Sequence, residues 1–218
     1  MFFGIANCLN VVSNLPFLVV GLAGLIFVLR AAWHQQSVFV AGVEKWPYVF
    51  CFGGVALAAF GSGYFHLAPD GARLMWDRLP ITLVFMSLLA ATIVERISAR
   101  TGVLLLLPLL LTGILSAVFW RWSVLQGAEN VVPYAIVQYG SILAIAAMAL
   151  TLPSRYTRGT DIWSVIGCYA AAKLAEVLDA PVYALGQVVS GHTLKHLIAA
   201  CAAWWLLRML KLRLRNSE

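Results

Sequence analysis

Charged residues are scarce in this sequence. They make up 11% of its 218 residues, and hydrophobic residues make up 62%, whereas about 25% of a soluble domain is charged. The mean hydropathy is +0.88. A composition this apolar excludes a water-soluble globular domain and indicates an integral membrane protein.

The patterns that define several other classes are also missing. Cys8, Cys51, Cys168 and Cys201 are far apart and form no CxxC pair, so we expect neither a disulfide framework nor a thiolate metal site. The net charge of +6 is spread between apolar runs, which argues against nucleic acid as a partner. The first residues lack a basic segment followed by a cleavage site, so the first apolar stretch is expected to be retained.

Long apolar runs, in contrast, are abundant. A transmembrane helix needs about 20 mainly apolar residues, and seven stretches qualify, joined by short loops. They are Asn10–Arg30, Trp46–His66, Trp76–Glu95, Gly102–Trp120, Val132–Leu152, Asp161–Leu178 and Ser190–Leu210. We therefore predict an all-α integral membrane protein, a seven-transmembrane helix bundle that forms a single domain over residues 1–218.

The basic residues predict an orientation, because loops rich in Lys and Arg stay in the cytoplasm. On the side of the carboxyl terminus we place Arg30, Lys45, Arg96, Arg100, Arg155, Arg158, Arg208, Lys211, Arg213 and Arg215. The other side receives Arg73, Arg78 and Arg121. This bias of ten against three predicts that the amino terminus is outside and the carboxyl terminus is cytoplasmic.

This topology brings polar residues of three spans to one depth near the outer surface. The second span ends at His66, the third has Asp77 in its first turn, and the seventh has His192 and His196 in its first two turns. Ser62 lies four residues before His66 and shares its helix face. Ionisable residues at membrane depth are costly, so a cluster of them predicts a functional site.

The histidine spacing favours a metal ion. His192 and His196 are spaced i, i+4, so both rings can face one ion, and His66 would supply a third nitrogen. Three histidines with an open fourth position are typical of catalytic zinc, which lowers the pKa of a bound water towards about 7. Asp77 would accept the proton of that water or orient it, and Ser62 would hydrogen-bond to an oxyanion or a ligand. Haem ligation, a proton relay and interhelical hydrogen bonds remain alternatives for such a histidine pair.

Charged residues in the sixth span form a second group. Lys173 and Glu176 are spaced i, i+3 and can pair, and Lys195 is another partner for Glu176 or for Asp179. These charges either neutralise one another and hold the last two spans together, or they donate to a histidine ring or steer a lipid headgroup.

Other polar residues have weaker signals. Asn10, Ser13 and Asn14 lie at the outer end of the first span, where they either brace the metal site or cap a helix. The remaining histidine, His34, falls in a cytoplasmic loop and is expected to be solvated.

Four motifs occur in a defined order along the chain. They are NVVSNLPF (Asn10–Phe17), GSGYFH (Gly61–His66), DRLP (Asp77–Pro80) and GHTLKH (Gly191–His196). With this order and spacing the chain resembles the alkaline ceramidases, from Asn10 to about Leu206. That family belongs to a superfamily of seven-span hydrolases that includes the adiponectin and progestin receptors.

The resemblance implies an activity and its residues. The zinc ligands of the family fall on His66, His192 and His196, and its serine and aspartate near the metal water fall on Ser62 and Asp77. The implied reaction is hydrolysis of the amide of ceramide, or of a related N-acyl lipid, to a sphingoid base or amine and a free fatty acid. The implied partner is a membrane lipid that reaches the site sideways from the bilayer.

The chain also departs from the family at several positions. The acidic amino-terminal segment that binds calcium in the eukaryotic enzymes is missing, and Asn7 stands about where an acidic ligand belongs, so calcium is not expected. Lys195 stands where many ceramidases have Trp, and Arg78 stands where Glu is expected. The tail has no retrieval signal, so a bacterial inner membrane is expected rather than an endoplasmic reticulum or Golgi membrane.

Three other classes compete with a zinc amidase. A non-catalytic receptor of the adiponectin-receptor type would keep the same metal core, but little soluble sensor sequence is present at either terminus. A retinal protein would use Lys195, which lies only about one and a half turns from its helix start, between two histidines. A haem cytochrome would need axial histidines on opposing helices at one depth.

Overall fold

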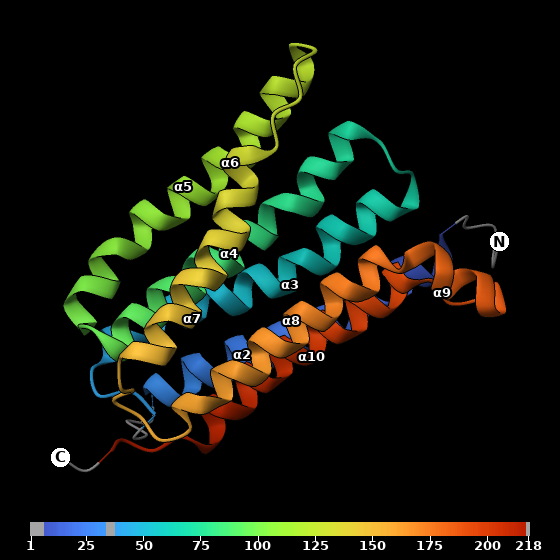
Figure 1. The fold of residues 1–218 in the computed structure, drawn as a ribbon. Coiled ribbons are helices and arrows are strands. Elements are labelled where there is room, and N and C mark those ends of the chain that lie inside the picture. Colours follow the sequence, from blue (N-terminus) through green and yellow to red (C-terminus); the bar gives the residue numbers. More distant parts are fainter. Residues whose placement is uncertain (1–6, 34–37, 217–218) are drawn as a thin grey trace.

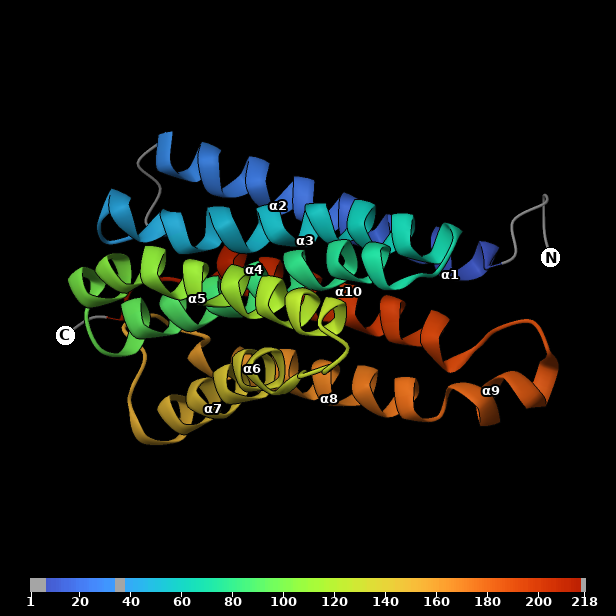
Figure 2. The ribbon, with the colours of Figure 1, turned by 90° about the horizontal axis from the view of Figure 1, so that it is seen from above.

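A computed structural model describes residues 7–33 and 38–216, and most of this part of the chain is helical (Figure 1). His34, expected to be solvated, lies outside the described residues. Helices α2, α3, α8 and α10 run side by side in two views at right angles (Figures 1 and 2), whereas α5 and α7 diverge from α8 and α10 in Figure 1. Outside the helices, the described residues form one isolated bridge between Tyr156 and Arg215.

The helical elements follow one another with short connections. The first half of the chain forms α1 (Cys8–Val12), α2 (Leu15–Trp33), the short 3-10 turn η1 (Gly42–Glu44), α3 (Lys45–Leu67), α4 (Gly71–Arg96) and α5 (Ala99–Leu125). The second half forms α6 (Val132–Ala135), the π-helical turn η2 (Ile136–Gly140), α7 (Ser141–Thr151), η3 (Gly159–Asp161), α8 (Ile162–Val177), α9 (Asp179–Gly186) and α10 (Gly191–Leu212).

Within the described residues, five helical stretches are long and apolar enough to cross a membrane. They are Cys8–Ala31, Gly42–Leu67, Gly71–Arg96, Ala99–Leu125 and Val132–Thr151. They overlap the first five predicted stretches, so the prediction of a helical, multi-pass membrane protein is confirmed. The last two long helices differ, because α8 has only 16 residues and α10 has histidines and a lysine in its first two turns. The sixth and seventh crossings stay predictions.

One face of α2 supports a lipid environment. Leu15, Val19, Leu22, Ile26 and Leu29 follow a helical repeat and are each 46–66% exposed. Side chains at this spacing share one face of a helix. A continuous apolar face of this length is unusual on a water-soluble protein and marks a surface that contacts apolar surroundings.

Two glycines allow helices to approach closely near the end of the bundle that holds the histidines. A Cβ atom at Gly61 of α3 would overlap the backbone carbonyl of Trp76 in α4. A Cβ atom at Gly191, the first residue of α10, would overlap the carbonyl of Ala175 in α8 and the backbone of Asp179. The first contact fixes the end of α3 against the start of α4, and the second fixes the start of α10 against the end of α8.

Capping residues set where two of these helices begin. Asp70 accepts a hydrogen bond from the backbone N–H of Arg73 at 2.7 Å, so α4 begins at Gly71. Asp77 therefore lies in the second turn of α4, and the prediction that it lies in the first turn is wrong. Ser190 accepts from the N–H of Thr193 at 3.2 Å. This cap starts α10 at Gly191 and puts both of its histidines in the first two turns, as predicted.

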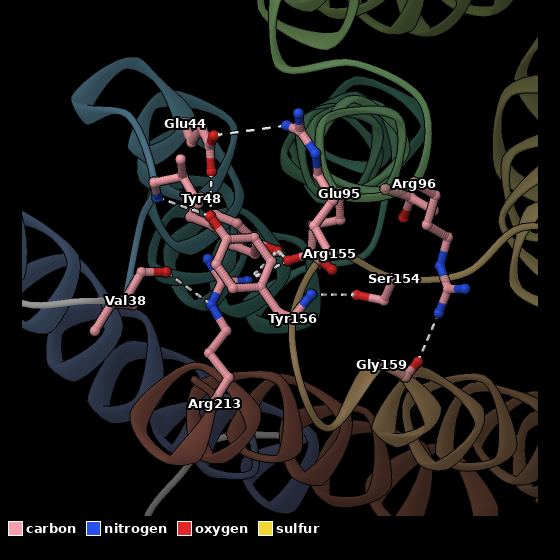
Figure 3. Close-up of polar contacts among 12 residues, drawn as sticks. Val38, Glu44, Tyr48, Glu95, Arg96, Ser154, Arg155, Tyr156, Gly159 and Arg213 are labelled. Carbon is pink, nitrogen blue, oxygen red and sulfur yellow. Dashed lines mark hydrogen bonds and ion pairs between the residues drawn. The ribbon is translucent and has the colours of Figure 1, made fainter. Parts of the chain in front are cut away.

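The opposite end of the bundle is closed by a buried group of charges and tyrosines (Figure 3). Arg213, which follows α10, forms a buried ion pair with Glu95 of α4 and donates from Nε to the carbonyl of Val38 at 3.0 Å. Tyr48 of α3 donates to the same Glu95 carboxylate. We call Tyr48, Glu95 and Arg213 the inner cluster.

Beside the inner cluster, a second carboxylate is held by a loop. Tyr156 donates to Glu44, which is 1% exposed, and Arg155 lies 3.9 Å from the same carboxylate. Burial, followed by the hydrogen bond to Glu44, raises the pKa of the Tyr156 hydroxyl, so this group remains a donor. The loop also pairs with the segment after α10, since the N–H of Thr157 donates to the carbonyl of Leu214 at 2.8 Å.

Candidate metal centre

Three imidazoles from two helices meet at one end of the bundle. His66 lies in the last turn of α3, and His192 and His196 lie in the first two turns of α10. One ring nitrogen from each lies within 4.8 Å of the others, and the Nε2 atoms of His66 and His192 are 3.1 Å apart. His66 and His196 are buried, and His192 is half-buried. The structure thus brings together the three histidines that the sequence placed at one depth.

The donor set fits a divalent transition metal such as zinc. Tetrahedral zinc, with Zn–N distances of about 2.0–2.1 Å, keeps its nitrogen ligands about 3.3 Å apart. The 3.1 Å between the Nε2 atoms of His66 and His192 is close to that value, and the limit of 4.8 Å for the whole group leaves only a small adjustment. Three imidazoles also leave one coordination position for water or substrate.

Ser13 orients His196 from the turn between α1 and α2. Its Oγ lies 2.8 Å from Nδ1 of His196 and donates to the carbonyl of Asn10 at 3.2 Å. A hydroxyl that donates to a carbonyl is free to accept from Nδ1–H, and this tautomer leaves the lone pair of Nε2 available to a metal. Support of this kind, a hydrogen bond on the far ring nitrogen, is typical of metal-binding histidines. Ser13 was predicted to act here or to cap a helix; its side chain contacts the imidazole.

Asn10 links the same turn to α10. Its side-chain oxygen accepts from Oγ1 of Thr193 at 2.6 Å, and its carbonyl accepts from Nδ2 of Asn14 at 2.6 Å. Asn14 is 2% exposed and makes no hydrogen bond to an imidazole within the described part of the chain, so it supports the turn rather than the rings. Asn7 adds a further contact, because its amide donates to the carbonyl of His66 at 3.2 Å.

The two predicted catalytic residues lie beside this cluster. The Oγ of Ser62 is buried and lies 3.5 Å from Nε2 of His196. Asp77 is half-buried and close enough for its carboxylate to interact electrostatically with His66. Ser62, Asp77, His192 and His196 all line one cavity, so they can act on the same bound molecule.

This cavity has a volume of about 310 Å³, which is within the range of pockets that hold small molecules. Most of its other walls are apolar, including Phe17, Val55 and Phe85. Its lining extends along α10 from His192 to Leu206, a distance of about 21 Å at 1.5 Å per residue. A long apolar cavity that has polar groups at one end suits a lipid with a polar reacting group.

The charges of the sixth predicted span contact one another. Lys195 of α10 and Lys173 of α8 both form ion pairs with Glu176, the first at 2.5 Å. Asp179 instead accepts a hydrogen bond from the backbone N–H of His192 at 2.6 Å. No described contact joins these carboxylates to an imidazole nitrogen. The geometry therefore agrees with the structural alternative, in which these charges hold α8 against α10.

Some residues of the site could not be predicted from the sequence. Phe17 contacts His196 edge-on at 6.2 Å between ring centroids. Tyr134, Gln138 and Tyr169 line the cavity, although nothing in their spacing pointed to the histidines. The i, i+4 spacing of Tyr134 and Gln138 does indicate that the two side chains share a helix face, but it does not indicate which residues that face contacts.

The fold and the cluster define a class: a multi-pass helical membrane protein with a three-histidine group that can hold a metal ion. Comparison with known proteins does not narrow this class. No family model matches the chain, and no curated protein matches it. The resemblance to the alkaline ceramidases therefore depends on the four motifs alone.

Proposed function

We propose that the chain is a zinc-dependent amidase that cleaves an N-acyl lipid within the membrane. The observation that supports this most strongly is the meeting of His66, His192 and His196, two of which, His192 and His196, line a long apolar cavity. A metal-binding group opening into an apolar cavity is suited to hydrolysis of a lipid that enters from the bilayer. Ceramide or a related N-acyl lipid is the proposed substrate, and a sphingoid base or amine and a fatty acid are the products.

Zinc held by the three histidines would act as a Lewis acid and lower the pKa of a water molecule bound to it. The protein's own groups would carry the proton. The carboxylate of Asp77 accepts the proton of the attacking water and returns it to the nitrogen of the leaving amine. The hydroxyl of Ser62 donates a hydrogen bond to the carbonyl oxygen as negative charge develops there.

The proposed topology follows from the same assignment. Seven crossings, with α8 and α10 as the sixth and seventh, put the amino terminus outside and the histidines near the outer surface. The excess of basic residues at the other end supports this orientation. The chain would then be integral to a bacterial inner membrane, with no calcium requirement.

Replacing a histidine tests the metal and the activity together. His192→Ala and His196→Ala are each expected to lose stoichiometric zinc and to lose amide hydrolysis, because two nitrogens hold zinc poorly. Zinc is measured by elemental analysis of the purified chain, and hydrolysis by release of palmitate from N-palmitoyl lipids. His34→Ala is the matched control and should keep both.

Two results would contradict the proposal. Full zinc content in both α10 variants would show that the ion binds elsewhere. Zinc bound by the wild-type chain without hydrolysis of any N-acyl lipid would favour the non-catalytic receptor with the same metal core.

A further inference from the structure

Arg78 is a cation in the cavity wall that forms no ion pair with any residue the structure describes. It follows Asp77 in α4 and lines the same cavity. Its guanidinium stacks on Trp120 of α5 at 3.9 Å and on Tyr134 of α6 at 5.0 Å. Its Nη1 atom is buried and has no hydrogen-bond partner among the described residues. Two aromatic rings thus fix the position of the guanidinium but leave its Nη1 donors unused.

The aromatic contacts do not compensate for the burial of Nη1 in this half-buried residue. Arginine stays protonated in proteins, and cation–π contacts are weak beside the cost of removing a charge from water. In addition, they satisfy the faces of the guanidinium and not its N–H groups, which point outward in its plane. The Nη1 atom of Arg78 therefore still requires a hydrogen-bond acceptor, which a bound molecule in the cavity can supply.

The other charges of the cavity do not meet that need. Glu176 is already bound by Lys173 and Lys195. Asp77 precedes Arg78 in the chain, and the described residues include no ion pair between the two. The buried Nη1 of Arg78 is therefore left without an acceptor among the described residues that line the cavity.

We propose that Arg78 binds an anionic group, a carboxylate or a phosphate, on the amine part of the N-acyl lipid substrate. This inference rests on the proposed amidase function and specifies the substrate class of that site. The acyl chain needs the apolar part of the cavity, whereas the amine part lies at the end where Asp77 and the histidines are. Arg78 follows Asp77 and lines the same cavity, so an anionic group about two to four bonds beyond the amide nitrogen is expected to reach its guanidinium.

Matched substrates test this assignment. N-palmitoylglycine carries a carboxylate, N-palmitoyl-O-phosphoethanolamine carries a phosphate, and N-palmitoylethanolamine is the neutral counterpart. With the purified zinc-loaded chain, we expect kcat/KM to be about tenfold or more higher for either anionic lipid than for the neutral one, the size expected for a hydrogen bond to a charged group. Arg78→Gln is expected to reduce this ratio to near one, mainly through KM, and Arg78→Lys to restore part of it.

A binding experiment tests this inference separately from the amidase proposal. Binding of the same three lipids to the zinc-free chain is followed by tryptophan fluorescence, because Trp120 contacts Arg78. Arg121→Gln, an arginine of α5 that does not line the cavity, is the matched control and should keep the preference for anionic lipids. Preferential binding of the anionic lipids without hydrolysis of any of them would contradict the amidase proposal and support the anion site.

Three results would overturn the anion site. The first is hydrolysis of all three lipids at similar kcat/KM. The second is an equal loss on charged and neutral lipids in Arg78→Gln. The third is that Arg78→Gln weakens only inhibition by palmitate, which would mean that Arg78 holds the released fatty acid and not the amine part of the substrate.

Discussion

At the scale of single residues, Asp77 combines exposure to the cavity with the lack of a fixed partner. Its carboxylate lines the cavity near His66 and makes no hydrogen bond or ion pair to another described residue. A carboxylate that is not held by a cation is free to accept a proton from water. This freedom distinguishes it from Glu176, which two lysines hold.

Asp77→Asn should therefore keep zinc but lose turnover. An amide cannot accept the proton, so kcat is expected to fall by about 10²–10⁴, with elemental analysis showing unchanged zinc. Asp70→Asn is a matched control in the same helix, because Asn caps a helix as well as Asp does, and it should leave kcat unchanged. Unchanged turnover in Asp77→Asn would remove this residue from the proposed reaction.

The residue scale also shows the reach of sequence reasoning at the site. His66, His192 and His196 were predicted together because each lies near an end of an apolar run, and depth in a membrane can be read from the chain. The contact of Ser13 with His196 joins residues 183 positions apart. Ser13 points at His196 because it lies in the turn between α1 and α2. Hydropathy does not reveal this turn, because the residues on both sides of it are apolar.

At the scale of elements, the ends of helices are less predictable than their middles. The predicted stretch Trp76–Glu95 lies inside α4, which starts five residues earlier at Gly71 because Asp70 caps it. The positive charges near the predicted cytoplasmic side were counted as loop residues, yet Arg213 is 3% exposed and pairs with Glu95. Hydropathy counts a charge in the same way whether it meets water or a partner from another helix.

The ion pair between Glu95 and Arg213 in the inner cluster can be tested with a double-mutant cycle. Glu95→Gln and Arg213→Gln should each destabilise the protein by about 3 kcal/mol, because each leaves one buried charge without its partner. The double variant should recover a large part of this loss, which a double-mutant cycle measures from unfolding in detergent. Additive losses would mean that the two side chains do not depend on each other. The matched control is Arg100→Gln, a change at an exposed residue.

At the scale of the whole molecule, the number of crossings depends on the side of the membrane on which residues 187–190 lie. If α8 and α10 cross the membrane, this connection lies outside; if they do not, it stays on the same side as residues 152–158. Val188 is 54% exposed and so is available for labelling.

Cysteine labelling distinguishes the two cases. In a chain whose four native cysteines are replaced by alanine, Val188→Cys is expected to react with a membrane-impermeant maleimide in intact cells. Arg100→Cys, at the predicted cytoplasmic end of α5, should react only after the membrane is permeabilised. Labelling of both positions only after permeabilisation would contradict seven crossings and leave five.

The position of Arg213 in the sequence has a consequence for biosynthesis. Glu95 is buried, but the cation that neutralises it, Arg213, is translated 118 residues later. Until residue 213 leaves the ribosome, an early-inserted hairpin carries an unneutralised carboxylate. Chains that stop before Arg213 should therefore be the forms that cellular proteases recognise, and chains that include it should escape them.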